Sequence, residues 1–216
     1  MVPIFHFLRK FIFKLHSFDL QYFPSVNYIF TLVKAKNIDF IGFGKYRKSS
    51  FLNKMELPGS NGVVKMSIPI KGGRGIKVSY ANTQIETASG WQEIHFKTIS
   101  SIYGNAPFFP FYKIGLQALY SRDMSNLFHW NLLCFDFFVK HAKMSNLIQF
   151  NVVEQEDDEI QPHLQHPILN NTQLPPYNQV FSDRIGFIPN MSCLDLLMNL
   201  GPDCSTYMHD CLNKLS

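Results

Sequence analysis

The chain has 216 residues, of which 46% are hydrophobic and 17% are charged, and its formal net charge is +4. This balance is typical of a globular protein and excludes an intrinsically disordered one. The positive charge is small and spread along the chain, so we expect no nucleic-acid partner. The 21 Phe and 9 Tyr residues predict an aromatic-rich core.

The four cysteines favour reduced thiols in a cytoplasmic protein. None stands in a CxxC pair, and three crowd the C-terminal part of the chain. The spacing of His163 and His166 suits a metal, but no other ligand lies nearby in the sequence, so we interpret them as loop histidines. We therefore expect neither a metal nor a cofactor.

Residues 1–16 are predicted to be an N-terminal extension, ahead of a domain over residues 17–216. Arg9, Lys10 and Lys14 interrupt its apolar residues, so it is neither a transmembrane segment nor a good signal peptide. A basic amphipathic helix in peripheral contact with a membrane is one interpretation. We favour an ordinary packed segment or an extension upstream of the true start.

The first elements of the domain predict a strand, a helix and a second strand. The first strand runs into Tyr22, and Pro24 then precedes a helix whose apolar residues extend from Val26 to Val33. Residues 38–43 have the composition of a strand. Such a unit predicts a parallel strand pair.

Residues 45–54, with the sequence KYRKSSFLNK, form a polar segment with basic residues beside Ser50 and Asn53. Such a cluster can hold a phosphate or a carboxylate through charged hydrogen bonds. A solvated loop is an equally good interpretation, because no glycine-rich phosphate cradle accompanies the cluster.

One glycine-rich turn precedes a predicted hairpin, and a second connects its two strands. Residues 59–62 (GSNG) and 72–75 (GGRG) are turn signals. Residues 63–70 and 76–80 show strand-like alternation on either side of the second turn. We therefore expect these two segments to pair in an antiparallel hairpin with one buried face.

Residues 90–112 contain the most distinctive stretch of the chain. Ser89 is the predicted N-cap of a helix that Gly104 ends in the left-handed conformation. Trp91 and His95 share its apolar face. Spacing alone favours a core histidine over a functional one, yet an imidazole one turn from a tryptophan is unusual enough to keep both interpretations.

The second half of the chain predicts helices over residues 111–120 and 126–142, the latter capped by Ser125, and a strand over 147–153. Residues 154–176 form an acidic and proline-rich loop. A helix begins at Ser192 and stops at Gly201. The fold class is therefore α/β, a single domain in which a mixed sheet has flanking helices and a helical C-terminal tail.

Four segments together resemble the WbqC-like family of bacterial proteins. They read LQYFPSVNYI, YRKSSFLNK, a WxxxH pattern with IxSIYGxAPFFxFY, and YNQVFSDRIGFIPNMSCLDLLMNLGP. The resemblance covers most of the chain from about residue 17 onward. The chain departs from it where many members have a His-Gln-Pro triplet, because Phe18, Asp19 and Leu20 stand there. Gly42 and Phe43 replace frequent acidic residues.

The resemblance implies a role in surface-polysaccharide (O-antigen type) biosynthesis, as a transferase that adds an amino acid or an acyl group to an amino sugar. The implied partner is a nucleotide- or lipid-linked amino sugar. The following residues match family positions without assigned individual roles: Tyr22, Lys48, Ser50, Asn53, Lys54, Trp91, His95, Tyr103, Asn131, Tyr177, Gln179, Asn190 and Asp195.

The chemistry of acyl transfer to an amine predicts a role for several of these residues. Transfer to an amine needs a base, for which His95 has the suitable ordinary pKa. It needs donors that stabilise an oxyanion, for which Asn53 and Tyr103 are candidates, so these three form the predicted catalytic set. Lys48 and Lys54 would hold a phosphate. The remaining substrate-binding predictions are Tyr22, Ser50, Trp91, Asn131, Tyr177, Gln179 and Asp195.

Two functions follow, and they predict different surroundings for His95. A cytoplasmic transferase predicts that His95 and residues 48–54 line one pocket. A non-catalytic binding or scaffolding partner of polysaccharide-biosynthesis enzymes predicts that His95 is buried without a cleft, and that an apolar patch is exposed elsewhere.

Overall fold

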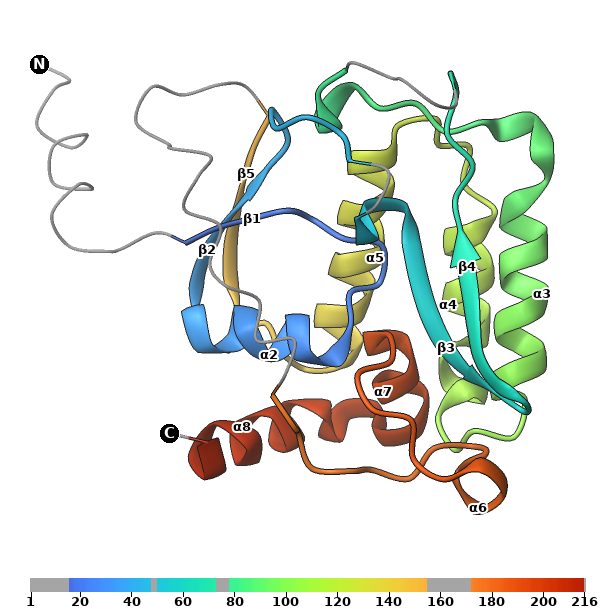
Figure 1. The fold of residues 1–216 in the computed structure, drawn as a ribbon, viewed down its shortest axis with the longest axis vertical. Helices are drawn as coiled ribbons and strands as arrows, with labels where there is room; N and C mark the ends of the chain where they lie inside the picture. The colour runs from blue at the N-terminus through green and yellow to red at the C-terminus, as the bar shows by residue number, and fades with distance from the viewer. Residues whose placement is uncertain (1–15, 48–49, 73–77, 155–171, 216) are drawn as a thin grey trace, which may run out of the picture.

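The structure is a computed structural model that describes residues 16–47, 50–72, 78–154 and 172–215. Within these ranges, three layers follow one another in space. A small parallel sheet lies against a helix, that helix lies against a helical pair and a hairpin, and a helical C-terminal segment runs beneath them (Figure 1). His163 and His166, Lys48 and the residues of the second glycine-rich turn beyond Gly72 lie outside the described residues.

The parallel sheet has the strand order β1-β2-β5, from β1 (His16–Phe18), β2 (Asn37–Ile41) and β5 (Gln149–Val153). Helix α2 (Val26–Ala35) connects the first two strands, as the sequence predicts. The first strand is shorter than predicted and stops before Tyr22. Residues 19–24 leave the sheet because their backbone makes hydrogen bonds to side chains and to other loops.

The register of the sheet centres on Asp39, which pairs with Ser17 on one side and with Asn151 on the other. The Asn151 side chain donates a hydrogen bond to the Asp39 carboxylate at 2.9 Å. Phe40 faces α5 (Leu127–His141), where its ring lies 4.9 Å from that of Phe135. This aromatic contact fixes the helix against the sheet.

A separate antiparallel hairpin consists of β3 (Lys54–Gly59) and β4 (Gly62–Ser67), and the 3₁₀ turn Phe51–Asn53 precedes it. The predicted pairing of residues 63–70 with 76–80 is wrong for the described residues 78–80, because Ser79 bridges Lys45 and Ile70 bridges Ile85. Residues 76 and 77 lie outside the described residues. The strand before the first turn, not the one after the second turn, pairs with Gly62–Ser67. In β3 burial alternates over residues 54–57 only, and the Lys, Glu and Pro residues obscured the strand pattern.

The helical layer contains α3 (Trp91–Tyr103), α4 (Phe109–Tyr120) and α5, and α3 packs beside α4 (Figure 1). Short 3₁₀ turns at Tyr80–Asn82 and Thr87–Ser89 lead into it. The predicted face of α3 is confirmed, because Trp91 and His95 are buried.

The predicted helix ends in this layer need correction. Helix α3 is preceded by Gly90, whose φ of 64° leaves Ser89 outside the N-cap position. Gly104 ends the helix with a right-handed φ of −52°, not a left-handed one. Helix α5 is capped by the Asn126 side chain, which accepts the His129 N–H at 2.9 Å, and not by Ser125.

The C-terminal segment contains α6 (Ser182–Ile185), α7 (Cys193–Leu200), the 3₁₀ turn Gly201–Asp203 and α8 (Cys204–Leu215). Helix α8 runs along α2 (Figure 1). The Ser192 side chain caps α7 by accepting the Leu194 N–H at 3.2 Å, as predicted. Gly201 ends α7 with a φ of 58°, also as predicted.

The predicted fold class is confirmed as a single α/β domain with flanking helices and a helical C-terminal tail. Its parallel and antiparallel strand pairs are divided between two small sheets. No helix among the described residues is both long enough and apolar enough to cross a membrane. Cys134, Cys193, Cys204 and Cys211 are buried and free.

Gly201 provides a test of the helix end. Its left-handed backbone disfavours a side chain, and an added Cβ would lie 2.3 Å from Cδ1 of Phe108. We expect Gly201→Ala to lower the free energy of unfolding by about 2 kcal/mol or more. Gly44→Ala is the matched control, since its Cβ would meet nothing within 4 Å. Equal urea-unfolding midpoints of the two variants would contradict this account of Gly201.

Candidate functional site

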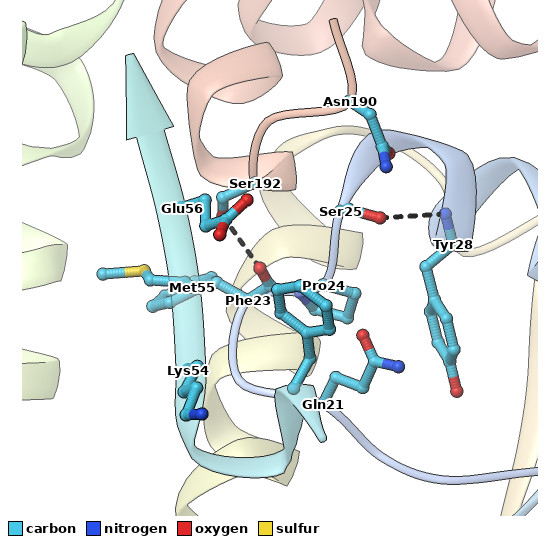
Figure 2. Close-up of a pocket in the computed structure, with 11 residues that line it drawn as sticks. Gln21, Phe23, Pro24, Ser25, Tyr28, Lys54, Met55, Glu56, Asn190 and Ser192 are labelled. Carbon is cyan, nitrogen blue, oxygen red and sulfur yellow. Dashed lines mark hydrogen bonds between the residues drawn. The ribbon is translucent and has the colours of Figure 1, made fainter. Parts of the chain in front are cut away.

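A small pocket lies where the loop before α2, strand β3 and the segment before α7 meet (Figure 2). We call it the junction pocket, and its volume is about 80 Å³. It is lined by Gln21, Phe23, Pro24, Ser25, Tyr28, Phe51, Lys54, Met55, Glu56, Asn190 and Ser192.

Backbone hydrogen bonds join the three walls of the pocket. The N–H of Val26 donates to the Met191 carbonyl at 2.9 Å, and the N–H of Cys193 donates to the Pro24 carbonyl at 2.6 Å. The N–H of Ser192 donates to the Glu56 carbonyl on β3 at 2.8 Å. These bonds satisfy backbone groups that burial would otherwise leave unpaired, so they hold the walls at a fixed separation.

Two residues of the pocket adopt backbone conformations that favour glycine. Phe23 has a φ of 39° and Asn190 has a φ of 57°. The Ser192 hydroxyl donates to the Phe23 carbonyl at 2.8 Å (Figure 2), and the Asn190 side-chain oxygen accepts the N–H of Asn27 at 3.0 Å. Asparagine tolerates this region, whereas a bulky residue such as Phe23 is strained there. Lys36 and Lys143 also have positive φ, so the junction holds two of the four such non-glycine residues of the described chain.

Two polar side chains that line the pocket make no hydrogen bond or ion pair with a described residue. Gln21 is only 8% exposed, yet its amide has no hydrogen-bond partner in the described part of the chain. Lys54 likewise has no ion pair with any described residue. Glu56 pairs with Lys65 at 3.1 Å. Because Gln21 lines the pocket and its amide makes no hydrogen bond to a described residue, that amide is available to a ligand or to water.

His95 lies in a closed aromatic cluster beside the pocket and is not part of the pocket lining. Its Nδ1 lies 2.9 Å from the Tyr22 hydroxyl, which is also hydrogen-bonded to the Tyr120 hydroxyl. The Trp91 ring meets the imidazole edge-on, with 5.1 Å between ring centroids. Tyr22 connects this cluster to the pocket through the chain, because it stands between Gln21 and Phe23.

Burial lowers the pKa of His95 from 6.5 to about 4, and a hydrogen bond with the Ser67 backbone only partly opposes this shift. The imidazole is therefore neutral at neutral pH. A neutral ring accepts at one nitrogen and donates at the other, which suits a Tyr22 donor on one side and a Ser67 carbonyl on the other. The histidine is thus held without charge among aromatic rings, and it is a weaker base than an ordinary imidazole.

A second buried polar group centres on Asp195 in the first turn of α7. Its carboxylate accepts hydrogen bonds from the Tyr103 hydroxyl at 2.9 Å, the Tyr177 hydroxyl at 2.6 Å, the Gln179 amide at 2.8 Å and the Asn199 amide at 3.1 Å. Burial raises the pKa of Asp195, and the four donors oppose that rise. This carboxylate joins α3, α7 and the segment before α6.

Two predicted site residues hold backbone segments near the pocket. The Asn131 amide on α5 donates to the Leu52 carbonyl and to the Tyr80 hydroxyl, each at 2.6 Å. The Asn53 amide donates to the Ile68 carbonyl at 2.7 Å. Both side-chain oxygens are buried and have no partner in the described chain. Asn131 and Asn53 thus position the chain that leads into β3.

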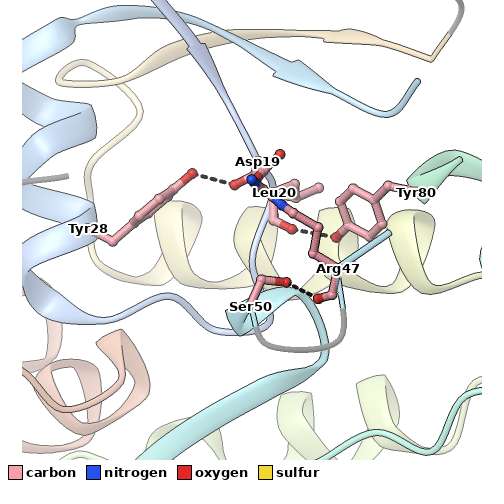
Figure 3. A network of polar contacts seen from close by, with 6 residues as sticks. All are labelled: Asp19, Leu20, Tyr28, Arg47, Ser50 and Tyr80. Carbon is pink, nitrogen blue, oxygen red and sulfur yellow. Dashed lines mark hydrogen bonds and ion pairs between the residues drawn. The ribbon is translucent and has the colours of Figure 1, made fainter. Parts of the chain in front are cut away.

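The polar segment 45–54 is attached to the loop before α2 through a network of contacts (Figure 3). Arg47 forms an ion pair with Asp19, and the Ser50 hydroxyl donates to the Arg47 carbonyl. The hydroxyls of Tyr28 and Tyr80 donate to the carbonyls of Asp19 and Leu20 (Figure 3). Asp19 therefore connects Arg47 and Tyr28 to the loop before α2.

With this geometry established, the family can be stated. A family model, the WbqC-like protein family, matches residues 21–159. The chain belongs to this family. A search of curated proteins and a search of solved structures each found no match.

In this WbqC-like protein, the predicted site residues fall into separate groups. Lys54 reaches the junction pocket, whereas Tyr22, Trp91 and His95 form the aromatic cluster. Tyr103, Tyr177, Gln179 and Asp195 form the carboxylate group.

Sequence reasoning missed Gln21 and Glu56 as lining residues. Gln21 precedes the tyrosine of the family-like LQYFPS segment, and that position was the available signal.

The aromatic cluster makes stability depend on pH. The unfolded state takes up a proton on His95 as the pH falls below about 6.5, while the folded state resists until about 4. Folding stability is therefore lost as the pH falls through that window, by about 2 kcal/mol between pH 7 and pH 5. Urea unfolding of His95→Gln should show about that much less loss between the two pH values. An equal loss in wild type and variant would contradict the lowered pKa.

The Asp195 group makes a second prediction. Asp195→Ala leaves the hydroxyls of Tyr103 and Tyr177 buried without their acceptor, so we expect a loss of about 3 kcal/mol or more in the free energy of unfolding. Asp183→Ala on α6 is the control, since that carboxylate is exposed and should change stability by less than about 0.5 kcal/mol. Thermal and urea unfolding measure both, and similar values for the two variants would refute the structural role of Asp195.

Proposed function

We propose that this WbqC-like protein is a cytoplasmic transferase of surface-polysaccharide biosynthesis. It would bind a nucleotide- or lipid-linked amino sugar at the junction pocket and transfer an acyl or aminoacyl group to the sugar's amine. Membership of the family supports the broader part of this proposal, since the resemblance implies that role.

The observation that carries the proposal is that the junction pocket combines apolar walls with polar groups that bind no described residue. Gln21 and Lys54 are not engaged by any described residue, and the rings of Phe23 and Phe51 stand beside them. Sugars present hydroxyls together with apolar C–H faces, so their sites combine hydrogen-bonding groups with aromatic walls. Lys54 would face the phosphate of the carrier.

In the transfer step, the amine nitrogen forms a bond to the acyl carbon while the leaving group departs and a base takes the amine proton. His95 is the proposed base, and its Nδ1 lies 2.9 Å from the Tyr22 hydroxyl. Asn53 and Tyr103 hydrogen-bond to Ile68 and Asp195, and their oxyanion role stays a prediction.

The enclosure of His95 favours a second candidate, a non-catalytic partner of polysaccharide-biosynthesis enzymes. His95 is 5% exposed and does not line the junction pocket. Phe111 and Ile114 stand one turn apart on α4 and are 76% and 81% exposed, which gives the apolar patch that this candidate requires. A turnover assay separates the two, since activity that is unchanged in His95→Gln would remove the histidine from the transferase proposal.

Ligand-induced thermal stabilisation tests the proposal directly. At a concentration of about 100 times the dissociation constant, a ligand stabilises the folded state by about 2.7 kcal/mol, which raises Tm by roughly 5 °C or more. We expect such a shift with nucleotide-linked amino sugars, and a smaller one in Lys54→Met. Lys97→Met, on the exposed face of α3, is the control. No shift with any sugar of the panel, for a folded protein, would contradict the proposal.

A further inference from the structure

The geometry of the junction pocket points to a specific chemical group: we propose that it binds the acylamino group of the sugar, an –NH–CO–CH₃ or similar substituent. This inference rests on the proposed function and adds a second feature of the substrate, an acylamino group on a sugar carbon other than the one that carries the acceptor amine. The arguments come from the pocket's size, its charge, its hydrogen-bonding groups and its walls.

Size restricts the occupant to a substituent. The volume of about 80 Å³ is well below the roughly 300 Å³ at which pockets for whole small molecules begin. It accommodates a group of a few non-hydrogen atoms, as the room that a water molecule needs indicates. The sugar ring would therefore remain at the mouth while one substituent enters.

Charge favours a neutral substituent. Lys54 and Glu56 are the two formally charged side chains among the lining residues, and their charges are opposite. A phosphate placed inside would face the Glu56 carboxylate, and an ammonium group would face Lys54, so each charged occupant meets a like charge. Glu56 is also engaged by Lys65 at 3.1 Å, which reduces its attraction for an incoming amine.

The side-chain amides that line the pocket can hydrogen-bond to an acylamino group. The Gln21 side chain offers both an acceptor oxygen and donor N–H groups, is 8% exposed and has no described partner. The Asn190 side-chain oxygen is engaged by the N–H of Asn27, so its NH₂ group is the part left for a ligand. Both side chains line the pocket (Figure 2). An acylamino group presents one carbonyl and one N–H, which these groups satisfy together.

The walls suit the terminal methyl group. Phe23, Pro24, Phe51 and Met55 supply the apolar lining. The hydrogen bond from the Ser192 hydroxyl to the Phe23 carbonyl holds Phe23 in its left-handed conformation, so this wall is formed before the ligand arrives. A preformed wall lowers the ordering cost of binding.

The test uses three probes that share a uridine diphosphate and differ at one position of the sugar: N-acetylglucosamine, glucose and glucosamine. Titration calorimetry on the wild type should give about tenfold tighter binding of the acetylated sugar than of the other two, the worth of one well-made neutral hydrogen bond with its methyl contact. In Gln21→Leu, which keeps the volume and removes the amide, that preference should fall to within about twofold. Gln117→Leu on α4 is the matched control.

A second variant guards against a folding artefact at Gln21. Asn190→Gly keeps the left-handed backbone and removes the amide, so it should also lose the preference. Equal affinity for the three probes in the wild type, or tightest binding of glucosamine, would overturn the acylamino assignment and leave sugar binding intact. Binding of none of the probes would overturn the proposed function together with it.

Discussion

The backbone seam between residues 23–26 and 190–193 is the constraint on which the rest of the structure depends. Two hydrogen bonds join the start of α2 to the start of α7, across more than 160 residues of chain, and a third joins the same seam to β3. Ser192 makes three hydrogen bonds here. Its N–H donates to Glu56, its hydroxyl donates to Phe23, and the same hydroxyl oxygen accepts the Leu194 N–H that caps α7. The junction pocket exists because these bonds hold three distant segments around one small space.

The two buried polar groups support that seam from either side. The Tyr22 hydroxyl ties the loop before α2 to His95 on α3, and the Asp195 carboxylate ties the first turn of α7 to Tyr103, also on α3. Helix α3 therefore contacts the chain on both sides of the seam, next to residues 23–26 and next to residues 190–193. Tyr22, His95 and Asp195 thus hold elements around the pocket together without lining it.

Local patterns made much of the fold predictable. The apolar spacing around Trp91 predicted the buried face of α3, and Ser192 and Gly201 predicted both ends of α7, because caps and periodicity depend on neighbouring residues. Strand β3 was not predicted, because its Lys, Glu and Pro residues obscure the alternation of apolar and polar residues. The pocket was beyond sequence reasoning, since the meeting of Gln21 and Asn190 depends on long-range hydrogen bonds and on a left-handed Phe23.

The most direct measurement is a crystal structure of this WbqC-like protein with an N-acetylated nucleotide sugar. The account predicts electron density for the acylamino group between the Gln21 and Asn190 side chains, with the diphosphate on the side of Lys54. Density for the sugar elsewhere would contradict it, for instance in the open groove of about 700 Å³ beside Phe181 and Arg184, with the junction pocket left without ligand.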